Sequence, residues 1–490
     1  MALFAAVLAA MEIYQGTALI FVICAFLFIV VAGATFNLAG GLSRPSGSYV
    51  LAYSVLAVIL GLFWKAFLGE RADSNLLQPN LTMEIYLGSI VSMYVAVVIS
   101  RKLTRHPPLL GNLVTDANMQ NATAGCLITG LAVLFLLMIS ERGSGSLLSA
   151  LGQLDRFLPM ALILGVIHEY RKSGGKRAVN LSVLVAGGAI FATGIFGFSK
   201  EGIFMPFACW AAAAGSVGYR LSRIQLMGLI FCFYFMVHYL VPFSQYGRNF
   251  KEEGTLRNSI PVALDLLGDL EGVRTKYLQS NLDRDETAGY FNSPQGLLDR
   301  LEMISRDDSL HDLTERHGPL GPFPLIMEFE NLIPRFIWPG KPIVNFGNFY
   351  AHEMGGLAPD DFTTGISFSP SGEAYHTGGW IGIFLWAPLL WIMLFTIFDS
   401  LCGDTRTAPW GLLAVARFSH MAPEGMLGGM IYDIGFFSIA LILAALSAAY
   451  VMPILGALIK GPERTTIRRI APVRSIPGRV RPAPVQGVGE

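Results

Sequence analysis

The stretch TALIFVICAFLFIVVAGATFNLAG, residues 17–40, decides the fold, because it contains no charged side chain. A helix needs about 20 apolar residues to cross the roughly 30 Å hydrocarbon core of a bilayer. The rest of the chain has a similar character: 53% of its 490 residues are hydrophobic and 14% are charged. Soluble domains carry about 25% charged residues. We therefore expect an all-α integral membrane protein rather than a cytosolic enzyme.

Apolar runs of this kind recur along the sequence and predict about eleven transmembrane helices. They divide the chain into an N-terminal bundle of about eight spans (1–242), a long hydrophilic loop with short helices (243–375), about three C-terminal spans (376–458) and a basic tail (459–490). The tail is rich in Pro and Arg and poor in large apolar residues, which predicts disorder. The expected spans are 17–40, 48–68, 81–100, 122–140, 156–170, 181–198, 202–219, 224–242, 376–398, 409–427 and 431–458.

Basic residues are distributed unequally between the alternate connections of this topology. One set, with the tail, holds 18 Lys and Arg, and the other short connections hold five. The positive-inside rule places the richer side in the cytoplasm. The tail is then cytoplasmic, with anionic membrane lipid as its expected contact, and the long loop is extracytoplasmic. The formal net charge is zero, so no overall basic field favours nucleic acid as a partner.

The long loop carries the densest group of ionisable residues. Arg335 follows a proline and precedes Phe-Ile-Trp, and Lys341 lies between a glycine and a proline, so both cations are on stiff backbone. An Arg fork beside a Lys suits a phosphate or pyrophosphate. The alternative is a pair of interfacial anchors that snorkel to the headgroups. The group comprises Glu328, Glu330, Arg335, Lys341, His352, Glu373 and His376.

Three further candidates lie near the expected outer membrane surface. Lys200 and Glu201 interrupt two spans in GFSKEGIF (197–204), either to face a headgroup or as a self-neutralising pair in a tight hairpin. Arg417 lies within an expected span, with His420 and Glu424 at near-helical spacing, where it either binds a ligand or forms a structural ion pair with Glu424.

The third of these candidates is Arg248, which follows the eighth span in QYGRNFK and suits a lipid phosphate or ordinary interfacial anchoring. Other chemistry is not indicated. The histidines lack H-x-x-x-H and H-E-x-x-H spacing, the five cysteines lack C-x-x-C spacing, and nucleotide-binding motifs are absent. We therefore expect no metal and no cofactor.

Three motifs in this arrangement resemble those of the O-antigen polymerase family, which is related to O-antigen ligases and to C-type glycosyltransferases. They are SKEG (199–202), PRFIWPGKP (334–342) and GEAY (372–375), which is followed by the glycine pair at 378–379. The similarity in topology covers residues 17–458, and the motifs cover about 60 residues. The PRFIWPGKP element is the most specific of the three.

The resemblance implies a metal-independent glycosyltransferase in the bacterial inner membrane. It would join oligosaccharide repeat units, carried on polyprenyl pyrophosphate, at the outer face, to make O-antigen or exopolysaccharide. A chain-length regulator and a flippase of the same pathway are implied partners. Arg335, Lys341, Arg248 and Lys200, with Arg417 as a further candidate, would bind the donor pyrophosphate, and Glu373, Glu330 or His376 would deprotonate the attacking hydroxyl.

Other classes of protein stay open at this point. A ligase that moves finished glycan to another acceptor would need the same cations. A transporter of lipid-linked glycan should place its charges in the middle of the membrane, whereas most charges here lie in the outer loop. A structural or sensory membrane protein has no need for such an aromatic, Arg-containing loop.

Overall fold

The computed structural model describes residues 1–460 apart from 112, 114–115, 140–151, 153–154, 251–255, 283–288, 294, 297, 336, 343, 358 and 363. All regular secondary structure in these residues is helical. The tail predicted to be disordered, from residue 461 onward, lies outside the described residues.

Seven described helices are long and apolar enough to cross a membrane, and each coincides with one of the expected spans. The prediction of a helical integral membrane protein is confirmed at this level. The other four expected spans correspond to helices of only 14 to 17 residues, so the number eleven stays a prediction. The seven runs are Leu19–Leu38, Pro45–Leu68, Pro79–Leu103, Met119–Met138, Arg223–Phe250, Pro370–Cys402 and Met426–Ile459.

The N-terminal bundle contains both long and short helices. Its element boundaries follow from local sequence: Pro79 occupies the first turn of a helix, where its missing N–H costs nothing, and Gly69 ends another helix with φ +77°. The helices are α1 (Ala2–Tyr14), α2 (Leu19–Leu38), α3 (Pro45–Ala52), α4 (Leu60–Leu68), α5 (Pro79–Leu103), α6 (Met119–Ile139), α8 (Phe157–Lys172), α9 (Leu181–Phe196), α10 (Lys200–Ser216), α11 (Arg223–Phe235) and α12 (Val241–Gly247).

The described residues of the expected long loop form six short α-helices, which agrees with the expected short amphipathic helices followed by a proline-rich part. The flanking long helices extend into the range assigned to the loop, to Phe250 on one side and from Pro370 on the other. Ser369 caps the second of these helices, which explains its early start. The short helices are α13 (Leu256–Gly268), α14 (Leu270–Leu282), α15 (Leu298–Leu301), α16 (Ile304–His317), α17 (Phe323–Asn331) and α18 (Phe346–Glu353).

The C-terminal part consists of two long helical runs separated by one short helix. π-helical turns join the segments of both runs, and the first run is kinked within α19 at Gly379, whose φ of +57° is not helical. Such turns add a residue without breaking the helix and are frequent near functional sites. The helices are α19 (Pro370–Ile381), α20 (Ala387–Cys402), α21 (Gly411–Glu424), α22 (Met426–Tyr432), α23 (Ser438–Leu446) and α24 (Met452–Lys460).

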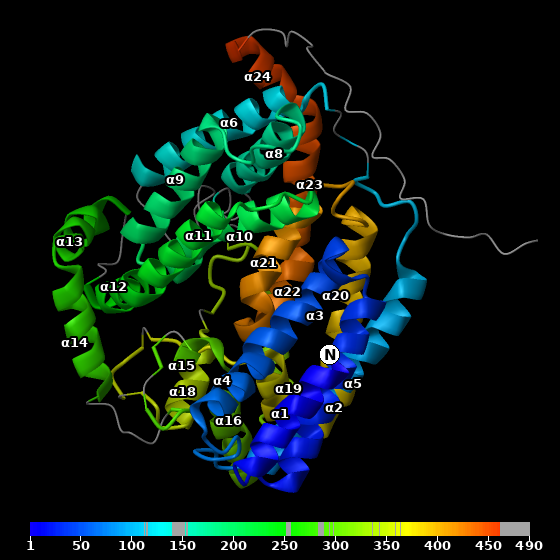
Figure 1. Cartoon of the computed structure of the whole chain (residues 1–490), viewed down its shortest axis with the longest axis vertical. Helices are drawn as coiled ribbons and strands as arrows, with labels where there is room; N and C mark the ends of the chain where they lie inside the picture. Colours follow the sequence, from blue (N-terminus) through cyan, green and yellow to red (C-terminus); the bar gives the residue numbers. More distant parts are fainter. Residues whose placement is uncertain are drawn as a thin grey trace, which may run out of the picture.

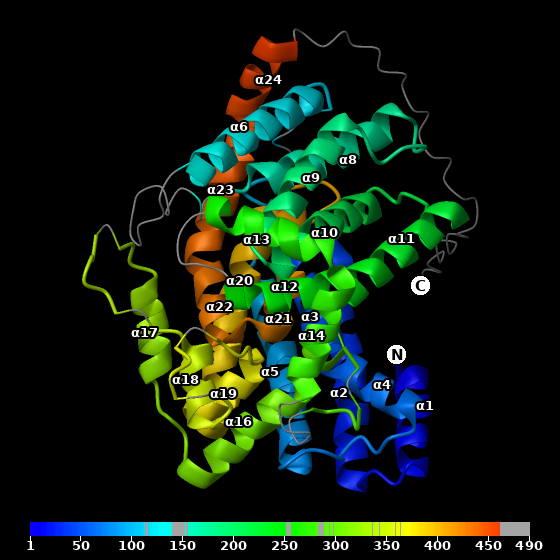
Figure 2. The same cartoon turned by 90° about the vertical axis from the view of Figure 1, so that its left-hand side faces the viewer.

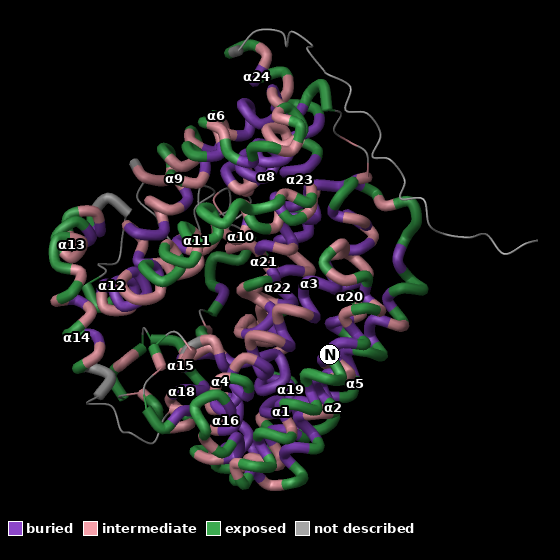
Figure 3. Tube along the Cα trace, in the orientation of Figure 1, coloured by how far each residue is buried: buried purple, intermediate pink, exposed green. Residues whose placement is uncertain are grey.

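The helices separate into two ends of an elongated molecule. Helices α6, α8, α9 and α24 gather at one end, and α15, α16 and α18 lie at the other (Figure 1). Helices α20, α22 and α23 run along the axis between them, while α17 and the chain after it lie at the side (Figure 2). Buried residues concentrate along these central helices (Figure 3). Of the ionisable residues singled out in the sequence, Glu328, Glu373 and Arg417 lie beside α22.

Candidate functional site

The site is organised by a sharp corner between α21 and α22. Helix α21 ends at Glu424, and α22 begins after Gly425 at Met426, whose φ is +58°. A positive φ is rare for a side chain of this size, so the surrounding structure must hold the corner. The first N–H groups of a helix have no partner within the helix. The corner therefore presents the first turn of α22 to neighbouring elements.

Glu373, a predicted general base, supplies the partner for this turn. Its Oε2 accepts a hydrogen bond of 2.5 Å from the N–H of Leu427, and its Oε1 accepts one of 3.0 Å from the Tyr350 hydroxyl. The side chain is 1% exposed. A carboxylate at a helix N-terminus is stabilised by the helix dipole. The structure thus gives Glu373 the geometry of a buried cap, with both oxygens occupied.

Glu328, on α17, brings a second carboxylate to the same turn. A Cβ added to Gly428 would lie 2.7 Å from its Oε1, so the glycine allows the side chain to reach α22. Asn331 donates to its Oε2 over 3.3 Å. Burial raises the pKa of Glu328, and the Asn331 hydrogen bond and the charge of Lys341 partly offset this. A half-buried carboxyl with a raised pKa has the properties of a general base.

Glu330, the candidate that the sequence favoured over Glu328, lies elsewhere on α17. Residues two positions apart on a helix do not share a face, and Glu330 makes no side-chain hydrogen bond or ion pair to any described residue. Glu328 belonged to the dense ionisable group, but its spacing within EFEN gave no reason to prefer it. The glycines of α22, which make room for its side chain, lie about 100 residues further along the chain.

The two predicted cations of PRFIWPGKP are bound to the backbone of their own region. The Lys341 ammonium, 9% exposed, donates to the carbonyls of Asn331 and Ile333 at 2.9 and 2.8 Å. These carbonyls end α17, so Lys341 caps that helix. The Arg335 guanidinium donates to the carbonyls of Lys341 and Pro342 at 2.8 and 3.0 Å.

The close approach of these cations changes their electrostatics. Burial lowers the pKa of Lys341, the positive charge of Arg335 lowers it further, and Glu328 opposes both effects. Arg335 is half-buried and carries five N–H donors. Two of them bind loop carbonyls, and among the described residues it makes no other hydrogen bond. The guanidinium therefore keeps donors for a ligand while it shapes the loop.

His376, the third predicted base, is buried one turn after Glu373 on α19. Its Nδ1 lies 2.9 Å from the Thr314 hydroxyl, and its ring packs against Tyr350. Its Nε2 is 3.4 Å from Oε2 of Glu353, close in distance but without the geometry of a hydrogen bond. Glu373 and His376 are thus connected through Tyr350, which contacts both.

A second ionisable cluster surrounds Arg417 and unites two candidates that the sequence kept apart. Its guanidinium donates to Glu201 on α10 over 3.1 Å and to Asp433 over 3.2 Å. His420 lies 3.3 Å from Glu424 and 3.9 Å from Glu201. The expected Arg417–Glu424 pair is not formed, because seven helical residues separate the two by about 10 Å. Asp433, buried on the π-helical turn after α22, was not predicted.

Lys200 and Arg248 flank the turn that precedes α10. Lys200 is the first residue of the helix, after the cap Ser199, and Glu201 beside it forms an ion pair with Arg417. Arg248 is exposed, and its Nε donates to the carbonyl of Phe198 over 3.1 Å. Lys200, Glu201 and Arg248 therefore surround one turn, next to the Arg417 cluster.

The sequence analysis missed the acidic pair Asp307–Asp308 on α16. Asp307 accepts hydrogen bonds from the Ser369 N–H (3.0 Å), the Ser369 hydroxyl and the Tyr86 hydroxyl (2.6 Å). Burial raises its pKa to about 6. A Cβ on Gly372 would lie 2.4 Å from its Oδ1, which explains the glycine of the GEAY motif. Asp307 thus holds the start of α19.

Asp308 holds the start of α5 in the same way. It accepts hydrogen bonds from the N–H groups of Leu77 and Gln78, at 2.5 and 2.9 Å, and from the Thr82 hydroxyl at 2.9 Å. Adjacent carboxylates on α16 therefore hold the starts of two helices of the bundle, which places Glu373 and His376 at fixed positions.

Comparison with known proteins assigns no relative. No family model, curated protein or solved structure matches the chain. Within the described residues, His, Cys, Asp and Glu side chains form no group of three that could hold a metal ion. The candidate chemistry therefore depends on two groups of residues beside α22: Glu373 with Glu328 at its start, and Arg417 with Glu201 and Asp433 at its end.

Proposed function

We propose that the chain is a glycosyltransferase that polymerises oligosaccharide repeat units carried on polyprenyl pyrophosphate, at the outer face of the bacterial inner membrane. The observation that supports this proposal is the convergence of separate motifs on one short helix. Glu373 of GEAY and Glu328 contact the start of α22, and Arg417 joins Glu201 of SKEG to Asp433 at its end.

The proposed reaction needs a base, bound cations and a path for a lipid carrier. A sugar hydroxyl attacks the anomeric carbon of the donor, the bond from that carbon to the pyrophosphate oxygen breaks, and polyprenyl pyrophosphate leaves. The proton of the attacking hydroxyl passes to a carboxylate, for which Glu328 is the best placed. Such a base contributes about 10²- to 10⁴-fold in rate.

Charge on the leaving pyrophosphate must be stabilised by cations that are already in position. Arg335 suits this role because its loop is held by its own hydrogen bonds, and Lys200 and Arg248 are further candidates. Lys341 is mainly committed to the end of α17. Arg417 has two carboxylate partners, so we assign it to positioning the cluster rather than to the pyrophosphate.

Deletion of the gene tests the class of reaction. Loss of the polymerase should leave glycan made of single repeat units, whereas loss of a ligase should accumulate long lipid-linked polymer, and loss of a transporter should trap units facing the cytoplasm. Polymer of normal length in the deletion strain would overturn the proposal.

A matched pair of variants tests the base. Glu328→Gln should lower polymer formation about 10²- to 10⁴-fold, while Glu330→Gln, on the same helix, should change it little. Both proteins must reach the membrane at normal level, measured by immunoblot. Equal polymer from the two variants would remove Glu328 from the mechanism and leave the deletion result to decide the class.

A further inference from the structure

Helix α17, at the side of the molecule (Figure 2), exposes large apolar side chains. Six of them, on the helix and in the turn after it, are between 37 and 65% exposed. Such a concentration of exposed apolar surface marks a contact with another molecule or with a membrane. The six, which we call the α17 row, are Phe323, Ile326, Phe329, Ile333, Ile337 and Trp338.

The other side of α17 packs against the membrane-spanning run Met426–Ile459. A Cβ added to Gly428 would lie 2.7 Å from Oε1 of Glu328, and one on Gly435 would lie 2.5 Å from Cδ2 of Leu332. A surface helix of a soluble protein turns its polar side to water and its apolar side to the core. Helix α17 instead turns a carboxylate inward and the α17 row outward.

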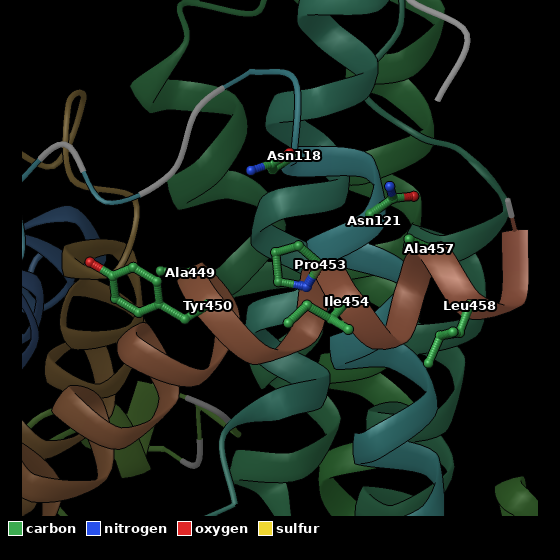
Figure 4. A pocket seen from close by; sticks show the side chains of 8 residues that line it. All are labelled: Asn118, Asn121, Ala449, Tyr450, Pro453, Ile454, Ala457 and Leu458. Atoms are coloured by element: carbon green, nitrogen blue, oxygen red, sulfur yellow. The ribbon is translucent and has the colours of Figure 1, made fainter. Parts of the chain in front are cut away.

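The same run exposes apolar side chains beyond its contact with α17. Ile439 and Leu443 are 52 and 46% exposed. Further along, the exposed Tyr450, Ile454 and Leu458 border an open groove beside α6 (Figure 4). On a membrane-spanning helix such side chains contact hydrocarbon. Because α17 packs on the first turns of this run, the α17 row lies next to the lipid that surrounds the run.

The turn after α17 supplies internal partners for its own backbone. The N–H groups of Ile337 and Trp338 both donate to the carbonyl of Pro334, at 2.9 and 3.1 Å, and the N–H of Lys341 donates to that of Trp338 at 3.2 Å. Proline has no N–H group that would need a partner. The turn contains three prolines within nine residues, 334–342.

The two cations of the turn bind further carbonyls. The Lys341 ammonium binds those of Asn331 and Ile333, and the Arg335 guanidinium binds those of Lys341 and Pro342. Non-helical backbone can lie at membrane depth only where its polar groups have partners other than water. These contacts give the turn that property, and they hold both cations to the backbone.

One acidic residue limits how deep α17 can lie. Glu330 follows Ile326 by four residues, at the margin of the α17 row, and a carboxylate is costly among acyl chains. This part of the helix therefore belongs at the level of the headgroups. Leu332 contacts the run at Gly435, seven residues further into the membrane-spanning run than Gly428, so the end of α17 lies deeper than its start.

We propose that the α17 row inserts into the bilayer leaflet beside the start of α22. Ile333, Ile337 and Trp338 lie deepest, at the boundary of headgroups and acyl chains where aromatic rings are favoured. Helix α17 is then a membrane anchor inside a stretch that the sequence assigned to a hydrophilic loop. The proposal does not depend on the reaction that the protein catalyses.

Nitroxide labels on single cysteines of the full chain, in phosphatidylcholine liposomes, test the proposal. Cys232→Ser leaves only buried cysteines, which the label does not reach. Oxygen concentrates in hydrocarbon and a nickel chelate stays in water, so the ratio of their collisions with the label reports its surroundings. Ile333→Cys should match the lipid-facing control Ile439→Cys and exceed the exposed control Arg316→Cys severalfold. Ile326→Cys should lie between the two controls.

Two results would overturn the proposal. A ratio at Ile333→Cys equal to that at Arg316→Cys would place the α17 row in water. Few collisions with either reagent would show that a second copy or another protein covers it. If a labelled chain fails to fold, lipids brominated on their acyl chains give the same decision, because they should quench the fluorescence of the wild type more than that of Trp338→Phe. Equal quenching would contradict insertion.

Discussion

Two regions of the stretch 243–375 hold charged residues in opposite ways. On α16, Asp307 and Asp308 reach out of their own helix and cap the starts of α19 and α5. In the segment 334–342, Arg335 and Lys341 bind carbonyls within ten residues of themselves. The acids therefore fix where this stretch lies on the bundle, whereas the cations determine only the shape of their own loop.

The difference teaches that the two regions should respond differently to mutation. The acidic pair is buried and connects elements that are distant in sequence, so its loss should destabilise the whole assembly. The loop is partly exposed and closed by local bonds, so its loss should remain local. The predictions below test this contrast, from the largest expected effect to the smallest.

Asp307→Ala should lower the free energy of unfolding by about 3–5 kcal/mol, because it leaves the Ser369 and Tyr86 donors buried and unpaired. Thermal unfolding in detergent measures the change. Arg316→Ala, which removes an exposed ion pair with Asp312, is the control and should cost less than about 1 kcal/mol. Equal effects of the two variants would break the contrast.

The pH dependence of stability should identify Asp307 as a buried acid. Its pKa is about 6 in the folded chain, against an ordinary value of 3.8, so the folded state binds the proton more tightly. The stabilisation is complete below about pH 4 and is lost as the pH rises through 6, a change of up to about 3 kcal/mol.

Asp307→Asn should flatten this profile, measured as unfolding midpoints between pH 4 and 7. Asp308 and Glu302, whose pKa values burial also raises, contribute slopes of the same sign and remain in both proteins. The difference between variant and wild type is therefore the relevant quantity. Parallel profiles would show that Asp307 does not titrate in this range.

Lys341→Met should lower the free energy of local opening of the loop by about 1.5–3 kcal/mol, because two carbonyls at the end of α17 lose a charged donor. Hydrogen exchange should rise in residues 331–342 and stay unchanged in α16. Lys276→Met, at an exposed lysine of α14, is the matched control. Faster exchange in α16 as well would mean that the loop also supports the bundle.

Arg335→Ala should have the smallest effect on stability, at most about 1.5 kcal/mol, because its bonds are half-exposed. If Arg335 binds the donor pyrophosphate, polymer should nevertheless fall about 10- to 150-fold. Arg335→Lys keeps the charge but loses the fork, so full activity would reduce the role to charge alone. Normal polymer from Arg335→Ala would end this assignment.

The sequence predicted the helical membrane class well, because hydrophobic runs of spanning length are local signals. It also predicted the irregular segment around PRFIWPGKP, since Pro and Gly act on their own backbone. It could not assign Asp307 and Asp308, which looked like ordinary solvent-facing acids of an amphipathic helix. Their partners on α5, Thr82 and Tyr86, lie more than 220 residues away.

The sequence predicted several residues of the candidate site, but it did not predict which of them contact each other. Arg417 and Glu201 were placed in separate groups because nothing in the sequence pairs positions 216 apart. Glu328 could not be distinguished from Glu330, because only Gly428 of α22, which makes room for the Glu328 side chain, decides between them. The four short spans were counted with the rest because their composition is apolar, although their helices have fewer residues than a full crossing requires.

The lengths of the two C-terminal runs bear on how deep the Glu373–Leu427 contact lies in the membrane. The run Met426–Ile459 contains 34 residues, or about 50 Å of helix, against about 30 Å of hydrocarbon, and the run Pro370–Cys402 contains 33 residues with a kink at Gly379. Tilt absorbs only part of the excess. Both runs begin near the contact of Glu373 with Leu427, and we expect their excess length to carry this contact to the level of the headgroups. Under the proposed function, a carrier lipid would present its sugar there while its tail stays in the leaflet.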